Sequence, residues 1–108
     1  MKFEEYRELS ARTMPKGLEN KDTLTNMCMG LAGESGELID HIKKVCFHGH
    51  ELDKAYISKE LGDILWYVAG LATALKIDLD DVAQANVDKL KARYPEGFSQ
   101  EASLNRTV

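Results

Sequence analysis

The sequence predicts an all-α protein whose helices pack as an antiparallel four-helix bundle. Apolar residues recur at steps of three and four along most of the chain, which is the spacing of one helix face. The alternation of apolar and polar residues that is typical of a half-buried strand is not found in the sequence. Short polar segments separate the periodic stretches, and short connections favour antiparallel packing of successive helices.

The first two helices are predicted over residues 3–13 and 22–47. Pro15 follows the first helix, and the His-Gly-His segment at 48–50 interrupts the second, since proline and glycine commonly mark helix ends. The side chains on the predicted inner faces are Phe3, Tyr6 and Leu9 in the first helix, and Leu24, Met27, Cys28, Leu31, Leu38, Ile42 and Val45 in the second.

The third and fourth helices are predicted over residues 54–75 and 79–94. Asp53 and Asp78 directly precede them, and aspartate is a favoured N-cap because its carboxylate accepts hydrogen bonds from free backbone N–H groups of the first turn. The apolar residues whose spacing predicts these helices are Ile57, Leu61, Ile64, Leu65, Val68, Leu71 and Ala72 in the third, and Val82, Ala85, Val87 and Leu90 in the fourth.

Length and composition indicate one soluble domain. A chain of 108 residues can bury a single core, so we expect a domain over residues 1–98 and a loosely ordered polar tail over residues 99–108. The net charge of −4 argues against nucleic acid as a partner, because its phosphates call for a basic surface. No apolar run is long enough to span a bilayer, and the acidic N-terminus is unlike a signal peptide. We therefore expect a cytoplasmic protein with no membrane partner.

Two pairs of carboxylates at helical spacing are the main candidates for a functional site. Glu34 and Glu37 lie three residues apart in the second predicted helix, as do Glu60 and Asp63 in the third, so each pair shares nearly one helix face. Apolar residues flank both pairs, and acids in apolar surroundings are costly without a positive partner. Four carboxylates meeting across a helix pair form an oxygen-rich site suited to Mg²⁺ or Mn²⁺. Such a site indicates phosphate chemistry.

Glycines accompany these acids. Gly30, Gly33 and Gly36 follow one another at three-residue steps in the second helix, and Gly62 lies between the acids of the third. Each glycine inside a helix costs roughly 1 kcal/mol relative to alanine, so the pattern calls for a reason. The stripe either leaves room for a ligand beside the acids or lets two helices pack closely.

The segments around the acids resemble the MazG-like all-α nucleoside triphosphate pyrophosphohydrolases. The resemblance is carried by Gly-Leu-Ala-Gly-Glu-Ser-Gly-Glu-Leu at 30–38 and by Lys-Glu-Leu-Gly-Asp-Ile-Leu-Trp-Tyr at 59–67. These segments contain the two halves, ExxE and ExxD, that mark this family. The segment 86–95 is similar to the family's last helix, which bears asparagine and lysine. The resemblance extends over residues 3–98, and neither acid pair alone would be as specific as both together.

The resemblance implies a hydrolase that cleaves (d)NTPs between the α- and β-phosphates and releases a monophosphate and pyrophosphate. Glu34, Glu37, Glu60 and Asp63 would then hold Mg²⁺ (or Mn²⁺), and Glu37 or Glu34 would also orient or deprotonate the attacking water. It further implies a role in sanitation of the nucleotide pool. Related proteins associate, and the helices are too apolar for a small monomer to bury, so a homodimer or a dimer of dimers is expected.

The substrate-binding candidates are less sharply defined. Lys89 and Arg93 lie one helical turn apart and are suited to phosphate oxygens, and Asn86 shares their face. Trp66 follows Asp63 by three residues, so it either stacks on a base or belongs to the core. The remaining lysines near the acids, Lys43, Lys44 and Lys59, are interpreted as surface residues.

Two other classes of protein would use the same helices differently. A non-catalytic helical interaction or regulatory module would keep the acids on its surface and bind no metal. A carboxylate-bridged di-metal redox bundle would share the acids, but its Glu-x-x-His signature is missing because His41 follows Glu37 by four residues. The pyrophosphohydrolase is the favoured interpretation.

Overall fold

The computed structural model describes residues 1–106 of the chain. The regular secondary structure of these residues consists of helices. An isolated backbone bridge between Pro95 and Gly97 is the one β-type pairing among these residues. None of the helices in this part of the chain combines the length and the apolarity that a bilayer span requires. The described residues form five helices: α1 (Phe3–Ala11), α2 (Asn20–Phe47), α3 (Lys54–Leu75), α4 (Leu79–Arg93) and α5 (Gln100–Leu104).

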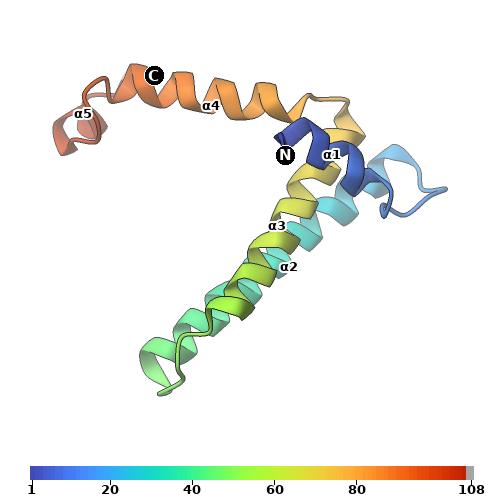
Figure 1. Cartoon of the computed structure of the whole chain (residues 1–108), viewed down its shortest axis with the longest axis horizontal. Helices are drawn as coiled ribbons and strands as arrows, with labels where there is room; N and C mark the ends of the chain where they lie inside the picture. Colours follow the sequence, from blue (N-terminus) through green and yellow to red (C-terminus); the bar gives the residue numbers. More distant parts are fainter. Residues whose placement is uncertain (107–108) are drawn as a thin grey trace.

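The two longest helices form an antiparallel hairpin, and the other elements gather at one of its ends (Figure 1). α1 packs across the end of α3 that is distant from the hairpin turn, and α4 packs against α1. From there α4 runs away from the hairpin, and a turn connects it to the short helix α5. The chain therefore has the outline of an open angle. Helix α2, helix α3 and the turn between them form one arm, and α4 with α5 forms the other.

The all-α class predicted from the sequence is confirmed, and the arrangement of the helices adds a qualification. One chain does not close four helices into a bundle, because α4 has α1 as its main neighbour and does not lie along α2 and α3. The aspartate caps are as predicted: Asp53 accepts from the backbone N–H of Tyr56 at 3.0 Å, and Asp78 accepts from that of Asp81 at 3.0 Å.

The polar C-terminal segment contains a short helix that the sequence did not predict. Residues 100–104 form α5, and the Ser99 hydroxyl caps this helix by accepting from the backbone N–H of Ala102 at 3.0 Å. A good N-cap allows one helical turn without apolar periodicity, which is why no sequence pattern indicated this helix. The last two residues of the predicted tail lie outside the described part of the chain.

Close contact between α2 and α3 depends on two glycines. A Cβ atom at Gly30 would overlap the ring of Tyr67, and a Cβ atom at Gly70 would overlap the side chain of Met27. Met27 is fully buried as a result. The close-packing explanation thus holds for Gly30, the first glycine of the predicted stripe, because it lets the two helices approach at the end of the hairpin near α1.

A network of polar contacts fixes the start of α4 against α1. The Glu4 carboxylate accepts from the Arg7 guanidinium at 2.8 Å and from the backbone N–H of Leu79 at 3.1 Å. Arg7 also donates to the Thr73 hydroxyl at 3.0 Å, and the backbone N–H of Glu4 donates to Asp80 at 3.3 Å. These contacts join α1, α3 and the start of α4 at the place where the two arms meet, and so they set the direction of α4.

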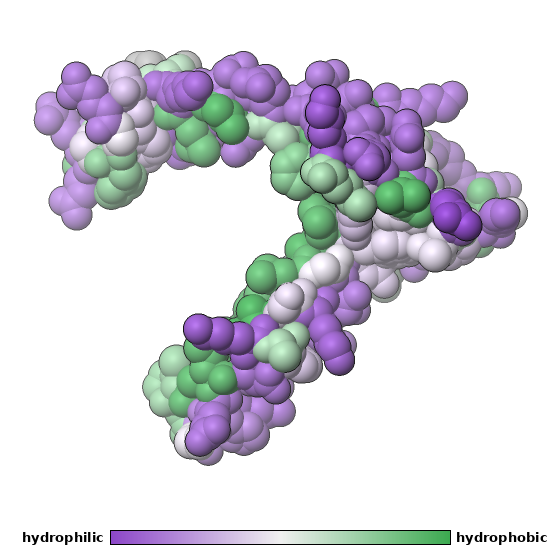
Figure 2. Space-filling view, viewed as in Figure 1, coloured by the Kyte–Doolittle hydropathy of each residue, from purple (hydrophilic) through white to green (hydrophobic). Residues whose placement is uncertain are grey.

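Apolar side chains remain exposed along the inner side of this angle (Figure 2). The radius of gyration is 17.1 Å, whereas a compact domain of this length has one of about 13 Å. Met27 is the only large side chain in the described residues that is fully buried. The exposed apolar residues of the two arms include Leu61 on α3 and Val82, Val87 and Leu90 on α4, with Phe98 beyond it.

Candidate active site

Three carboxylates converge between the two helices of the hairpin. Glu34 and Glu37 come from α2 and Glu60 comes from α3, and each offers an oxygen atom within 4.8 Å of the others. We call these three residues the acidic cluster. Because the members of the α2 pair lie one helical turn apart, both can face the same carboxylate on α3. The predicted meeting of the two acid pairs is thus realised for three of the four residues.

The acidic cluster is partly removed from water and is short of positive partners. Glu60 is only 6% exposed. One carboxylate oxygen of Glu60 and one of Glu34 are buried without a hydrogen-bond partner. Buried polar atoms in native proteins are nearly always paired, and an unpaired buried carboxylate is costly. A divalent cation would satisfy both oxygens, so the donor set fits Mg²⁺ or Mn²⁺.

The electrostatics of the cluster favour the uptake of positive charge. The adjacent Glu34 carboxyl, which can share a proton with Glu60, raises the pKa of Glu60 from 4.5 to about 7, and burial and the Glu37 carboxylate add to this effect. Near neutral pH, Glu60 therefore holds a proton for part of the time. A bound cation would replace that proton.

Asp63, the fourth predicted acid, lies apart from the cluster. Its side chain is exposed, one helical turn beyond Glu60 in the direction of α1. Burial raises the pKa of the Tyr6 hydroxyl, and the negative charge of Asp63 contributes to this rise, so Asp63 lies within electrostatic reach of Tyr6 on α1. A metal ion held by all four acids would require this side chain to reorient toward Glu60.

Trp66 is held in place by the turn that follows α1 and by its neighbour on α3. Its indole N–H donates to the Thr13 hydroxyl at 2.8 Å. Its ring meets that of Tyr67 edge to face, with centroids 5.0 Å apart. The side chain is half-buried, so it is neither a fully enclosed core residue nor a free surface residue. Thr13 could not be identified from the sequence, because no periodic pattern links it to α3.

The three candidates on α4 are not brought to the acidic cluster within one chain. Asn86 and Lys89 are exposed on the arm that leaves the hairpin (Figure 1). Arg93, near the end of this helix, lies over the Tyr94 ring with its guanidinium carbon 6.0 Å from the ring centroid. Their predicted role in phosphate binding therefore depends on a second chain.

A further group of polar residues lies beside the cluster, toward the hairpin turn. The Lys44 ammonium pairs with the Asp40 carboxylate at 2.9 Å. Tyr56 is half-buried, and its ring lies against that of His41, with centroids 4.9 Å apart. Sequence reasoning missed Tyr56, although its position four residues before Glu60 places it on the same face of α3.

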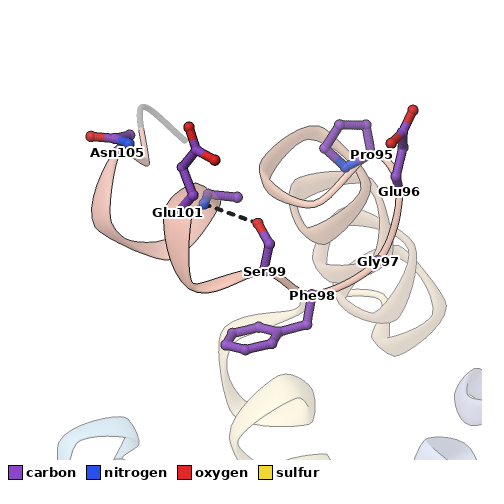
Figure 3. Close-up of a pocket in the computed structure, with 8 residues that line it drawn as sticks. Pro95, Glu96, Gly97, Phe98, Ser99, Glu101 and Asn105 are labelled. Carbon is purple, nitrogen blue, oxygen red and sulfur yellow. Dashed lines mark hydrogen bonds between the residues drawn. The ribbon is translucent and has the colours of Figure 1, made fainter.

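A separate hollow lies at the C-terminal end, far along the chain from the acids. It has a volume of about 470 Å³ and is formed by the turn between α4 and α5, with Pro95, Phe98 and Asn105 in its wall (Figure 3). Glu96 and Glu101 also line it, and none of its lining residues is a cation. Because its charge is negative, this hollow is a poor site for a phosphate-bearing ligand.

Comparison with known proteins identifies residues 22–98 as a match to the MazG nucleotide pyrophosphohydrolase domain. This segment contains all three residues of the acidic cluster. The chain is also similar to the Gene 37 protein of Mycobacterium phage L5, with 37% identity over 87 residues that cover 77% of this chain and 76% of the phage protein. No solved structure matches the chain significantly.

Proposed function

Because the chain belongs to the MazG nucleotide pyrophosphohydrolase family, we propose that it hydrolyses nucleoside triphosphates to a monophosphate and pyrophosphate. The reaction breaks the bond between the bridging oxygen and one of the α- and β-phosphorus atoms, and water supplies the oxygen and the protons that the two products gain. The observation that carries this proposal is the acidic cluster, with its two buried and unpaired carboxylate oxygens inside the matched segment.

Glu34, Glu37 and Glu60 would hold Mg²⁺. Asp63, one turn beyond Glu60, would become a fourth ligand after its side chain reorients toward the cluster. When bound, the ion supplies Lewis-acid polarisation and neutralises charge on the triphosphate. Glu37 is the exposed member of the cluster, so water reaches it most easily, and Glu34 is its half-buried neighbour. One of these two carboxylates would orient the attacking water and accept its proton.

The exposed apolar surface supports a homodimer or a dimer of dimers. A chain with a radius of gyration of 17.1 Å and apolar residues along the inside of its angle leaves much hydrophobic area in water. A second copy seated in that angle would cover this area. In such an assembly, Asn86, Lys89 and Arg93 of one chain would approach the hairpin of another and bind substrate phosphates there. We further propose that the protein acts in the cytoplasm, in sanitation of the nucleotide pool.

The experiment that tests this function is hydrolysis of a panel of dNTPs and NTPs with Mg²⁺, in which monophosphate and pyrophosphate are measured directly. Glu37→Gln and Glu60→Gln should lose activity by at least about a hundredfold, since each removes a charge from the proposed metal site. Glu51→Gln is a matched control, because Glu51 is exposed in the hairpin turn outside the cluster. A helical interaction module, by contrast, would show no turnover and no response to these substitutions beyond stability.

A further inference from the structure

The face of the hairpin that carries the acidic cluster continues toward the turn with an Asp–Lys ion pair on α2 and a tyrosine on α3. Asp40 and Lys44 follow Glu37 by three and seven residues on α2, which are the spacings of one helix face. Tyr56 precedes Glu60 by four residues on α3. Both helices therefore place polar groups beside the cluster on its turn side.

The lysines in this region share one carboxylate. Asp40 pairs with Lys44 at 2.9 Å and with Lys43 at 3.4 Å. Two ammonium groups against one carboxylate leave one positive charge uncompensated within this group. Asp40, three residues beyond Glu37 along α2, thereby fixes the Lys44 ammonium, and the group of three side chains keeps a net positive charge.

Tyr56 is fixed by contacts on two sides. Asp53 accepts from the backbone N–H of Tyr56 at 3.0 Å, and the imidazole of His41 accepts from the backbone N–H of Asp53 at 3.2 Å. The ring of His41 also packs against that of Tyr56, with centroids 4.9 Å apart. These contacts hold the phenol ring in a defined place between the two helices.

The surroundings of the Tyr56 hydroxyl connect the acids to the lysine. Burial raises the pKa of Tyr56, the carboxylates of Glu60, Glu37 and Asp40 raise it further, and Lys44 opposes them. The hydroxyl therefore lies within electrostatic reach of both the cluster and Lys44. A neutral phenol at this point is a hydrogen-bond donor that a phosphate oxygen can use.

The opposite side of the cluster has a different chemistry. Beyond Glu60 toward α1 come Asp63 and then Trp66, whose indole is fixed by Thr13. An aromatic surface suits a nucleobase, whereas a lysine and a phenol suit phosphate oxygens. The hairpin thus has Lys44 and the Tyr56 phenol on one side of the acidic cluster, and Asp63 and the Trp66 indole on the other.

We propose that Lys44 and Tyr56 bind the β- and γ-phosphates, so that pyrophosphate leaves toward the hairpin turn while the nucleoside lies toward Trp66 and α1. This inference rests on the proposed function and adds the orientation of the substrate and two phosphate-binding residues. A triphosphate carries about four negative charges near neutral pH, and carboxylates alone would repel it. The cluster with Mg²⁺ and the lysine pair beside it together oppose that repulsion.

The test compares inhibition by the two products in wild type, Lys44→Met and Tyr56→Phe, in the presence of Mg²⁺. Lys44→Met should weaken inhibition by pyrophosphate about tenfold or more, the size expected for a charge-assisted contact. Tyr56→Phe, which keeps the ring and its packing, should weaken it several-fold. Inhibition by the nucleoside monophosphate should change less than about twofold in both. Lys21→Met controls for the loss of one positive charge, because Lys21 is exposed at the start of α2.

Calorimetric titration of Mg²⁺-pyrophosphate into the same proteins gives a second readout that does not depend on turnover. We expect the loss of pyrophosphate affinity to parallel the loss of inhibition. Wild-type turnover with unchanged pyrophosphate inhibition and affinity in both variants would overturn this inference and leave the proposed function intact. Absence of turnover in the wild type would overturn both.

Discussion

Gly30 sets how closely α2 and α3 approach, so its replacement by alanine should destabilise the protein. The new methyl group would overlap three carbons of the Tyr67 ring, Cδ1, Cε1 and Cζ. That ring cannot simply turn away, because it also packs against Trp66. Overpacking of this kind costs about 1–3 kcal/mol. Glu34 lies one turn further along α2, so the same strain would shift the acidic cluster.

Gly33→Ala is the matched control for this substitution. Gly33 belongs to the same helix, is exposed, and has no atom within 4 Å of an added Cβ. Both alanines gain helix propensity, about 1 kcal/mol each, so that gain cancels when the two variants are compared. The difference in their unfolding free energies then isolates the overlap with Tyr67, and Gly33→Ala itself should be more stable than wild type.

Urea unfolding followed by circular dichroism at one fixed protein concentration measures this difference. We expect Gly30→Ala to be less stable than Gly33→Ala by about 1–3 kcal/mol, which corresponds to roughly 4–8 °C in Tm for each kcal/mol. The protein concentration must be the same for all variants because association would shift the apparent stability. Equal stability of the two alanine variants would refute the proposed packing of the hairpin.

The remaining predictions concern the acidic cluster and the tryptophan. Mg²⁺ at about a hundred times its Kd should raise the unfolding free energy of wild type by about 2.7 kcal/mol, and its Tm accordingly. The same Mg²⁺ concentration should have little effect on Glu60→Gln. Equal shifts in both proteins would exclude Glu60 as a ligand. The metal-free protein should lose stability as the pH rises from 4.5 to about 7, because Glu60 keeps its proton in the folded state up to about pH 7 and loses it near 4.5 when unfolded. Calorimetry at pH 7 in two buffers of different ionisation enthalpy should accordingly detect release of about half a proton on Mg²⁺ binding, and no release would contradict the raised pKa. Thr13→Val removes the acceptor of the Trp66 indole N–H and should cost about 1 kcal/mol. Since Trp66 is the only tryptophan, the emission maximum should also shift, and an unchanged spectrum would argue against this contact.

The local elements of the fold could be predicted from the sequence because their causes are local. Asp53 and Asp78 cap the helices that follow them, as their position and side chains indicate. The direction of α4 could not be predicted, because it depends on contacts between distant residues such as the Glu4 carboxylate and the backbone N–H of Leu79. The helix at 100–104 was missed because its cap, Ser99, lies in a stretch without apolar periodicity.

The candidate site likewise has features with local causes, which the sequence predicts, and features that depend on contacts between helices. The spacing of Glu34 and Glu37 places both on one face of α2, and that much follows from helix geometry. Which residues of α3 lie opposite them depends on the register of the hairpin, which the close contact of Gly30 with Tyr67 helps to set. That register brings Glu60 and Tyr56 toward the α2 acids and leaves Asp63 outside the acidic cluster. Periodicity along one helix carries no information about register between two.

The most direct test of the central claim is to identify the products that wild-type protein makes from a single triphosphate with Mg²⁺, by phosphorus NMR, beside Glu60→Gln. We predict equal amounts of monophosphate and pyrophosphate from the wild type and almost none from the variant. A diphosphate with inorganic phosphate would mean that the cut falls at another bond. That result, or equal turnover by Glu60→Gln, would contradict the assignment of the acidic cluster as the site of pyrophosphohydrolysis.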